Sequence, residues 1–446
     1  MTQSIAEDFV NRIQNGDAII GVIGMGYVGI PLSHAFVNAG LKVIGFDVLE
    51  DRVKNMNDGK SPIKTFDSAK LKGMIKKGLF EASSDMSRLS EADALLICVP
   101  TPLNLYREPD LSYVVKSTET IAKTLRKGQL VVLESTTWPG TSDEVMRPIL
   151  EATGLSSQTD FAIAYSPERE DPGNKDFDTG KIPKVVGADS EAGAKMALAL
   201  YETAVSEVVH VSDTRTAEAV KLTENIFRSV NIALVNEMKG IFNDMKIDVW
   251  EVIDAAKTKP FGYMPFYPGP GLGGHCIPID PFYLTWKARA FGRPTRFIEL
   301  AGEINDRQPT EVVNATSAAL NKTLRKALSD STVMIVGVSY KEDIDDMRES
   351  PSFHIWELLE EHGANVVYHD PYIPEIPHTH EHEEFTGRKS MELTVDTLKG
   401  VNAIIIATHH GNVDYEFLME HVDVIVDTRN AIHKSGLVVP EKLVKA

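Results

Sequence analysis

Residues 18–47 read AIIGVIGMGYVGIPLSHAFVNAGLKVIGFD, and this stretch decides the fold of the first part of the chain. The apolar run at 18–23 predicts a buried strand, and three glycines follow it with the spacing GxGxxG. An apolar run at 30–39 then predicts a helix, and residues 41–46 predict a second strand. Strand, helix and strand in this order form a βαβ unit of about thirty residues, which is typical of a parallel, doubly wound sheet.

Each glycine of the motif has its own physical role. Gly24 permits a tight turn, Gly26 lets a pyrophosphate lie against the backbone, and Gly29 lets the helix pack on the strand. The N-terminus of the helix offers free N–H groups and the positive end of its dipole to the phosphates. Asp47, at the end of the second strand, would bind ribose hydroxyls and repel a 2′-phosphate, so the stretch predicts NAD rather than NADP. The candidate cofactor-binding residues are Gly24, Gly26, Tyr27, Val28, Gly29, Asp47, Arg52, Pro100, Thr101 and Thr136.

Composition limits the classes of protein to which the chain can belong. The chain has 446 residues, which predicts two or three domains, and its formal net charge of −18 argues against nucleic acid or an anionic membrane surface as a partner. Two cysteines give no disulfide framework and indicate a reducing, cytoplasmic setting. The N-terminus lacks the apolar segment of a signal peptide, and the longest apolar runs are of strand length, so no membrane association is expected.

Strands and helices continue to alternate through the first half of the chain. Further apolar runs of strand length lie at 94–99, 130–133, 161–165, 184–187 and 208–211. Polar groups follow several of these runs, and the carboxyl ends of parallel strands face the ligand crevice. Thr136 and Glu168 are therefore candidate catalytic groups, although a solvated loop residue is the common alternative for a glutamate. Cys98, inside the run 94–99, is interpreted as a small buried apolar residue.

The middle of the chain changes character. Residues 216–245 form one long helical pattern without a proline, and its apolar face includes Phe227, Leu234 and Ile241. Lys221 and Asn225 are four residues apart on this helix and share a face, although two exposed polar residues would give the same spacing. Residues 282–326 continue the helical pattern with glycine and proline interruptions, which predicts more than one helix or a kink.

A second alternation of strands and helices begins at residue 332, and it predicts a smaller doubly wound domain. Only Gly337 of a glycine fingerprint remains there, which argues against a second dinucleotide and favours the mononucleotide end of another ligand. Residues 374–390, rich in Pro, His and Glu, predict a mobile surface loop. Its alternating histidines are more typical of solvated surface than of a metal site, and no metal is expected: His378, His380 and His382.

Residues 269–281 read GPGLGGHCIPIDP, and this loop holds the other cysteine, Cys276. Glycines allow a close approach of backbone to a ligand, and prolines limit the conformations of the loop. A structural turn with a chance cysteine is the alternative. A cysteine beside NAD can add to an aldehyde, and the adduct loses a hydride to give a thioester that water cleaves. This chemistry needs a cation near the thiolate, an oxyanion donor and a base for the water; Lys221, Asn225, Glu168 and Asp280 are of the right types.

These motifs resemble those of the UDP-glucose/GDP-mannose dehydrogenase family, whose members oxidise the C6 alcohol of a nucleotide sugar to a uronate with NAD. The resemblance covers nearly the whole chain and rests on segments 24–29, 134–136, 166–168, 221–225, 273–276 and 341–350. It implies Cys276 as the thioester-forming nucleophile, with Lys221 and Asn225 as oxyanion stabilisers. It also implies that Glu168, Thr136 and Asp280 serve thioester hydrolysis. The implied substrate contacts are Glu168, Arg169, Lys221, Asn225, Tyr267, Gly271, Gly273, Lys341 and Arg348.

The resemblance also implies an architecture. We expect an α/β fold with two doubly wound Rossmann-like domains joined by a central helical domain. The expected parts are an NAD-binding domain at 1–212, a helical dimerisation domain with the cysteine loop at 213–327 and a UDP-sugar-binding domain at 328–446. The family's usual assembly, a dimer built on the central helices, predicts a homodimer or a higher homo-oligomer.

One departure from the family pattern bears on the substrate. Glucose-type members commonly have Pro-Lys-Asp after the cysteine, whereas this chain has Pro278, Ile279 and Asp280, preceded by His275. The loop resembles the branch that oxidises UDP-N-acetylhexosamines for polysaccharide biosynthesis. The expected substrate is UDP-N-acetylglucosamine, with UDP-N-acetylmannosamine or UDP-glucose as alternatives. Two other classes are a nucleotide-sugar epimerase or decarboxylase with bound NAD, which needs no cysteine, and a non-catalytic nucleotide-sugar sensor.

Overall fold

The computed structural model describes residues 3–63, 66–104, 106–169, 180–274, 277–379, 382–438 and 443–446. His275, Cys276 and His380 lie outside these ranges. Contacts divide the chain into two compact units, and each is described by itself. Unit 1 comprises Met1–Glu224 and Phe282–Arg293, and unit 2 comprises Asn225–Pro281 and Pro294–Ala446. No helix in the described ranges has the length and apolar character needed to cross a membrane.

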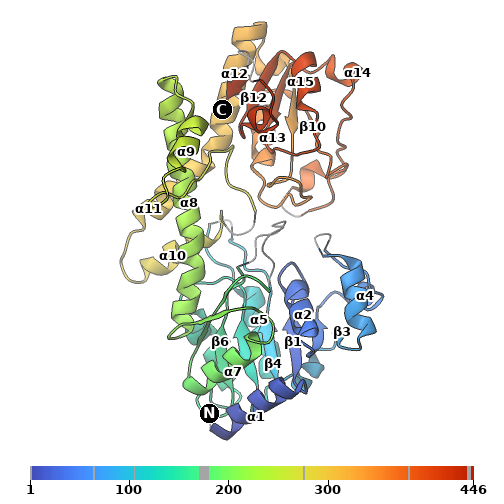
Figure 1. The fold of residues 1–446 in the computed structure, drawn as a ribbon, viewed down its shortest axis with the longest axis vertical. Coiled ribbons are helices and arrows are strands. Elements are labelled where there is room, and N and C mark those ends of the chain that lie inside the picture. The colour runs from blue at the N-terminus through green and yellow to red at the C-terminus, as the bar shows by residue number, and fades with distance from the viewer. Residues whose placement is uncertain are drawn as a thin grey trace. The chain divides into compact units, whose positions relative to one another are not determined.

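Unit 1 is built on an eight-stranded sheet with the order β3-β2-β1-β4-β5-β6-β7-β8 (Figure 1). Neighbouring strands are parallel except for β6 and β7, which are antiparallel. The buried runs of the sequence form the central strands, as predicted. The bounds are β1 Ile19–Ile23, β2 Lys42–Phe46, β3 Phe80–Ser83, β4 Ala94–Ile97, β5 Leu130–Leu133, β6 Ala162–Tyr165, β7 Lys184–Ala188 and β8 Val208–His210.

Helices of unit 1 connect these strands, and α1 packs against α7. Side-chain caps start two of the helices, because Asp67 accepts from the backbone N–H of Ala69 and Ser190 from that of Gly193. Phe9 and Ile13 of α1 are buried in the same core as Ile20 and Val22 of β1. The bounds are α1 Gln3–Asn15, α2 Gly29–Asn38, α3 Glu50–Asn57, α4 Ser68–Lys76, α5 Ser112–Ala122, α6 Arg147–Glu151, α7 Glu191–Tyr201 and α10 Asp280–Arg289, of which the last begins in unit 2.

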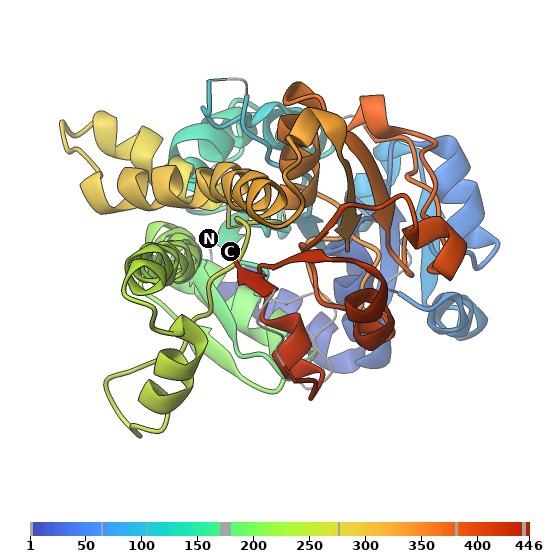
Figure 2. The ribbon, with the colours of Figure 1, turned by 90° about the horizontal axis from the view of Figure 1, so that it is seen from above.

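Unit 2 contains a five-stranded parallel sheet with the order β10-β9-β11-β12-β13. Alternate residues of β9 face opposite sides, with Val333 and Ile335 in one core and Met334 and Val336 in another. Helix α12 lies beside α13 over the first of these cores (Figures 1 and 2). The strands are β9 Thr332–Val336, β10 Asn365–His369, β11 Ala403–Ile406, β12 Val424–Asp427 and β13 Leu443–Lys445, and the helices of the sheet are α13 Pro351–Glu361, α14 Val395–Leu398, α15 Tyr415–His421 and α16 Ala431–Lys434.

The long helix predicted in the middle of the chain is present as α8, Thr214–Asp244. The predicted interruptions of the next helical region separate α10, α11 and α12. A single residue, Arg307, separates the last two, and Pro309 stands at the start of α12, where a proline is tolerated. The helices of this region in unit 2 are α9 Val249–Ala256, α11 Arg296–Asp306 and α12 Gln308–Leu324.

The segment 374–390 differs from its prediction as a surface loop. Ile376 and Phe385 are each 1% exposed and belong to the core of the second sheet. Glu375 and Lys389 form a β-bridge that closes the segment at its base. The prediction of a loop lying wholly on the surface is therefore wrong, because two apolar residues among the polar ones anchor it. Among the described residues no group of three or more His, Cys, Asp or Glu is placed to hold a metal ion.

Candidate active site

The glycine motif after β1 forms an open backbone cradle. Gly24 has a φ of +94°, and a Cβ there would lie 2.6 Å from the carbonyl oxygen of Cys98. A Cβ on Gly29 would lie 2.1 Å from the carbonyl oxygen of Gly24. Gly26 is different, because a Cβ there would meet no atom within 4 Å. Two glycines thus serve the turn and the packing, and the third leaves space beside the N-terminus of α2, where a pyrophosphate fits.

Asp47 stands at the carboxyl end of β2, the predicted position of the ribose-binding acid. It is 7% exposed, and its Oδ1 accepts from the backbone N–H of Leu49 at 3.0 Å. Its Oδ2 accepts from Nη1 of Arg52 at 3.2 Å. Arg52 therefore pairs with the acid in this structure, and the pair stands at the carboxyl edge of the sheet.

The loop after β4 is tied to the segment that follows the cysteine loop. The Tyr283 hydroxyl donates to the backbone oxygen of Thr101 at 2.7 Å. Tyr283 is fully buried, and its ring lies 6.3 Å from that of Trp138. Within unit 1, the loops after β4 and β5 therefore both contact the start of α10. The two loops are also joined directly, because the Ser135 hydroxyl donates to the backbone oxygen of Val99 at 2.7 Å.

Glu218 of α8 fixes the loop after β5. Its carboxylate accepts from the backbone N–H of Gly140 and from the N–H and hydroxyl of Ser142, the latter two at 2.9 and 2.8 Å. Burial raises the pKa of Glu218 to about 7, although these three donors lower it. Thr136, in the same loop, is half-buried.

Glu168 stands three residues beyond β6, in a cluster that includes a buried lysine. Its Oε2 accepts from Nζ of Lys184 at 3.2 Å, and its Oε1 accepts from the backbone N–H of Arg169 at 2.7 Å. Lys184 also donates to Oε2 of Glu134 at 2.7 Å. Arg169 makes an ion pair of 2.6 Å with Glu224 of α8. The predicted residues Glu168 and Arg169 are thus held by neighbours that the sequence reasoning did not name.

Two polar residues of α8 lie one helical turn apart. Lys221 is 8% exposed and Asn225 is 2% exposed, so neither is the exposed polar residue of the alternative reading. Nδ2 of Asn225 donates to Oδ2 of Asp280 at 2.5 Å, and Asp280 is 2% exposed. The structure thus brings together two of the predicted catalytic residues, Asn225 and Asp280, within unit 2.

The glycine-rich loop packs tightly against the second sheet domain. A Cβ on Gly273 would lie 2.6 Å from the Cβ of Tyr340, and the N–H of Gly274 donates to the backbone oxygen of Arg348 at 3.0 Å. Gly271 has a φ of +139° and faces Pro351. These glycines are required by close contact with chain 340–351, so the loop that leads to Cys276 is held by unit 2.

Two cations lie near the start of this loop. A Cβ on Gly269 would lie 2.4 Å from Nη1 of Arg429, whose Nε donates to the backbone oxygen of Ala407. Among the described residues no carboxylate forms an ion pair with Arg429. Lys239 of α8 is 4% exposed, and its Nζ donates to Oε1 of Gln308 at 3.1 Å. The pKa of Lys239 is lowered to about 8, mainly by burial and partly by the nearby Arg429, although Glu311 raises it.

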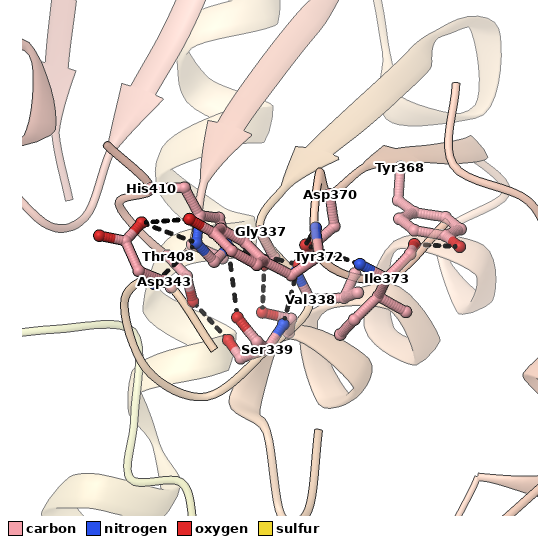
Figure 3. A network of polar contacts seen from close by, with 12 residues as sticks. Gly337, Val338, Ser339, Asp343, Tyr368, Asp370, Tyr372, Ile373, Thr408 and His410 are labelled. Carbon is pink, nitrogen blue, oxygen red and sulfur yellow. Dashed lines mark hydrogen bonds and ion pairs between the residues drawn. The ribbon is translucent and has the colours of Figure 1, made fainter. Parts of the chain in front are cut away.

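A network of polar contacts fills the carboxyl edge of the second sheet (Figure 3). Oδ2 of Asp370 accepts from the N–H groups of Val338 and Ser339 at 2.8 and 3.2 Å, and its Oδ1 accepts from those of Tyr372 and Ile373. His410, which is fully buried, accepts at Nδ1 from the N–H of Asp343 at 3.0 Å. The backbone donors that follow β9 are therefore taken by the protein's own carboxylate.

The remaining predicted substrate contacts have partners of their own. Arg348 makes an ion pair of 2.6 Å with Asp346. The Tyr267 hydroxyl donates to Asp254 at 2.7 Å, and Lys257 donates to the same hydroxyl. Lys341 follows Ser339, whose hydroxyl donates to the Lys341 backbone oxygen at 3.0 Å. These contacts fix the loops but leave the substrate assignments as predictions.

Sequence reasoning assigned no role to Lys184, Arg429, Lys239 or Asp370, and it named Glu134 only as part of a family segment. A signal existed for Asp370, because it ends a predicted strand as Asp47 does. Lys184 begins a strand, a position that usually lies far from the carboxyl edge, so its sequence position gave no signal. Arg429 and Lys239 are recognisable only once the fold brings them to Gly269.

Comparison with known proteins decides the family. Three family models, all described for the UDP-glucose/GDP-mannose dehydrogenase family, match in order. They are the NAD binding domain at residues 18–205, the central domain at 215–307 and the UDP binding domain at 334–434. The chain belongs to the UDP-glucose/GDP-mannose dehydrogenase family.

Two relatives that resemble the chain are named for different UDP-sugars. A UDP-N-acetyl-D-glucosamine 6-dehydrogenase of Pseudomonas aeruginosa is 36% identical over 370 residues, which cover 82% of this chain and 86% of the relative. A UDP-N-acetyl-D-mannosamine dehydrogenase of Pyrococcus horikoshii is 34% identical over 421 residues, covering 93% and 96%. A solved structure of UDP-D-ManNAc dehydrogenase from Pyrococcus horikoshii has a TM-score of 0.85 at 32% identity and covers 96% of this chain and 98% of that one.

Family membership confirms the predicted fold class and the cofactor. The chain is an NAD-dependent UDP-sugar dehydrogenase with an NAD-binding domain, a central helical region and a UDP-binding domain. The open backbone at Gly26 and the acid at Asp47 fit NAD.

Proposed function

We propose that the substrate is UDP-N-acetylglucosamine and that its C6 alcohol is oxidised to the carboxylate in two steps. The observation that carries the choice of sugar is the loop sequence GHCIPIDP at 274–281. Ile279 stands in it where glucose-type members commonly have a lysine, and its side chain is 7% exposed, so the position supplies apolar volume and no charge. Both relatives compared above are named for UDP-N-acetylhexosamines, which supports the same class here.

The proposed reaction passes through a thioester on Cys276. NAD, when bound, accepts one hydride at each of the two oxidation steps. The first step takes a hydride and a proton from the C6 alcohol and leaves an aldehyde. The Cys276 thiolate then adds to the aldehyde carbon to give an alkoxide adduct, and loss of a second hydride from that carbon gives the thioester. Water attacks the carbonyl carbon, the C–S bond breaks, and the carboxylate and the thiolate are released.

The chain's own residues have distinct proposed tasks in these steps. The Lys221 ammonium group stabilises the negative charge on the oxygen of the adduct and favours the thiolate form of Cys276. Asn225 donates to the same oxygen or, as the bond to Asp280 supports, holds that carboxylate in place. Glu168 accepts a proton from the attacking water, with Thr136 and Asp280 binding that water.

The nucleotide part of the substrate is proposed to bind at the edge of unit 2. Arg429 and Lys239 supply positive charge beside Gly269, and no described carboxylate lies within ion-pair distance of Arg429. A guanidinium binds phosphate oxygens through two parallel hydrogen bonds, which suits a diphosphate. Lys341 and Arg348 lie in segment 340–351, against which the glycine-rich loop packs, and they are the predicted further contacts.

The test is the number of NADH molecules formed for each sugar consumed. The protein is incubated with NAD and, separately, with UDP-N-acetylglucosamine, UDP-N-acetylmannosamine and UDP-glucose, and products are identified by mass. We expect two NADH and one uronate for each UDP-N-acetylglucosamine, with the highest kcat/KM of the three. A higher kcat/KM for the mannosamine sugar, which the second relative's name favours, would transfer the proposal to it. No NADH with any of them would reject dehydrogenase activity on these sugars.

A further inference from the structure

Lys184 is a buried cation between two carboxylates in unit 1. Its side chain is 4% exposed, and its Nζ lies 2.7 Å from Oε2 of Glu134 and 3.2 Å from Oε2 of Glu168. The Glu134 side chain is fully buried and also accepts from the Tyr201 hydroxyl, whereas Glu168 retains 15% exposure. We call these four residues the Lys184 cluster. Only its Glu168 corner reaches solvent, and Glu168 is the carboxylate that the proposed function assigns to thioester hydrolysis.

The antiparallel direction of β7 is what brings a lysine to this place. Tyr165 at the end of β6 pairs with Gly187, and Ala164 pairs with Ala188. Extending this register by three residues places Glu168 opposite Lys184. Strands β5 and β6 end at the same edge, where Glu134 and Glu168 follow them. The first residue of β7 therefore lies among the carboxyl ends of its neighbours, which a parallel strand could not achieve.

The charges of the cluster are unequal, with one cation for two carboxylates. Burial raises the pKa of Glu134, although Lys184 lowers it. Burial lowers the pKa of Lys184, but the two carboxylates raise it by more, so the ammonium group is charged at neutral pH. Burial and the neighbouring Glu134 together raise the pKa values of Tyr201 and of Cys98, the residue after β4, so both are neutral. Arg169 is directed to Glu224 and to the backbone oxygen of Pro183.

We propose that Lys184 is a positioning residue for thioester hydrolysis, which holds the Glu168 carboxylate at the sheet edge and keeps it ionised to accept a proton from water. The inference rests on the proposed function, because it assumes the role of Glu168. In the step concerned, the water oxygen bonds to the thioester carbon, its proton passes to Glu168, and the Cys276 sulfur leaves as thiolate. Without the ammonium group, both carboxylates lose the cation that stabilises their negative charge, so both bind a proton more readily. A protonated Glu168 cannot act as a base.

The test compares four variants at the Lys184 cluster, and one control variant outside it, in the full-length protein over a range of pH. Lys184→Met removes the cation, Glu134→Gln removes the second carboxylate, and the double variant removes both. Lys184→Arg keeps the charge. Lys195→Met is the matched control, because this lysine of α7 is half-exposed and pairs with Glu7 at 3.8 Å, away from the Lys184 cluster. Each is measured for uronate formation, for the first burst of NADH and for protein-bound thioester by intact mass.

We expect Lys184→Met to slow uronate formation about tenfold to hundredfold at pH 7 while a thioester accumulates on the protein, since the base is lost after hydride transfer. In the profile of uronate formation against pH, the acidic limb of this variant lies at higher pH than that of the wild type. Glu134→Gln moves that limb to lower pH, because Lys184 then serves Glu168 alone. The double variant returns the limb towards that of the wild type, and Lys184→Arg and Lys195→Met leave it in place.

The outcomes separate this inference from the function on which it rests. If the wild type forms no thioester and no second NADH, the proposed function fails before Lys184 is tested. If the wild type performs both oxidations but Lys184→Met and the double variant are equally slow at every pH, Lys184 is only structural and the inference is rejected. Wild-type rates in Lys184→Met would reject it as well. If Lys184→Met does not fold, Glu134→Gln tests the inference instead. An acidic limb of the pH–rate profile that does not move in Glu134→Gln would then reject it.

Discussion

Lys239 is a charged side chain that the fold buries with one neutral partner, the side-chain oxygen of Gln308. The desolvation of the ammonium group sets its folded-state pKa to about 8, below its ordinary value of 10.5. Between these two values the unfolded chain binds more protons than the folded one, so the free energy of unfolding rises with pH across this window. Below pH 8 the buried charge of Lys239 lowers the free energy of unfolding. Its proposed function is to bind the diphosphate of the substrate beside Gly269.

We therefore expect Lys239→Met to increase the free energy of unfolding at pH 7 by about 2–3 kcal/mol, because one pKa unit corresponds to about 1.4 kcal/mol. The rise in stability between pH 8 and 10 should disappear in the variant. Urea denaturation at several pH values measures both effects, with Lys322→Met on the exposed side of α12 as the control. If the lysine serves the substrate, KM for the UDP-sugar rises in the same variant. A variant less stable than the wild type at pH 7 would contradict this account.

Cys276 carries the proposed covalent chemistry. Replacement by serine should lower uronate production by orders of magnitude, because a serine hydroxyl is a weaker nucleophile and its ester is cleaved more slowly than a thioester. Steady-state production of uronate, followed by mass, checks this prediction. Cys98→Ser is the matched control for loss of a thiol, since Cys98 is buried at the end of β4. Near-normal uronate production by Cys276→Ser would remove this cysteine from the mechanism.

At the residue level, sequence predicted the groups whose place follows from a motif or from helix spacing. Lys221 and Asn225 share a helix face, and both proved buried. Asp280 was predicted by family resemblance, and its bond to Asn225 depends on how the loop folds back on α8. Lys184 could not be predicted, because its closeness to Glu168 depends on the direction of one strand, which no local pattern records.

The two sheets use the acid after their second strand in different ways. Asp47, after β2, bonds one backbone N–H and Arg52 and leaves the glycine turn after β1 open. Asp370, after β10, accepts four backbone N–H groups, two of which belong to the turn after β9. Its carboxylate takes the donors that a phosphate would use in a dinucleotide-binding domain. This gives a physical reason to expect the nucleotide at another place in the second domain, as in the proposed contact with side-chain cations.

Asp370→Ala should therefore destabilise the protein strongly. Four buried or half-buried N–H groups lose their acceptor, and each unsatisfied donor costs about 1–3 kcal/mol, so a total of at least about 3 kcal/mol is expected. Urea unfolding measures the loss, and Asp396→Ala is the control, because that side chain is 87% exposed. The folded fraction should also bind UDP more weakly, because the loop before Lys341 is no longer fixed. A loss no larger than that of the control would show that water replaces the carboxylate.

At the element level, the sequence predicted the central strands and the long helix well, because their apolar runs and helical periods are strong. It missed β3 and β13, which are edge strands of three or four residues with few apolar positions. It also missed the antiparallel pairing of β7 with β6. Edge position and strand direction are set by tertiary contacts, so a single sequence holds little trace of them.

At the scale of the whole molecule, α8 carries a stripe of exposed apolar side chains. Phe227, Leu234 and Ile241 are 49%, 52% and 51% exposed, although they are large and apolar. They follow one another at intervals of seven residues, so they lie along one side of the helix. Exposed apolar side chains in such a row are typical of a protein–protein interface. The stripe agrees with the predicted assembly of at least a dimer through the central helices.

We expect the wild type to sediment as a dimer or larger at micromolar concentration, and Leu234→Glu combined with Ile241→Glu to shift it towards the monomer. Each new carboxylate would be buried in an apolar interface without a partner. The free energy of desolvating two charges exceeds the binding free energy that two apolar side chains contribute. Sedimentation velocity measures the change, and circular dichroism checks that the variant is folded. The control is Lys399→Glu, at a side chain that is 69% exposed and follows α14 in the second sheet domain. It changes charge without touching the stripe and should leave the mass unchanged. An unchanged mass in the double variant would place the interface away from this side of α8, whereas a monomeric wild type would reject the predicted assembly itself.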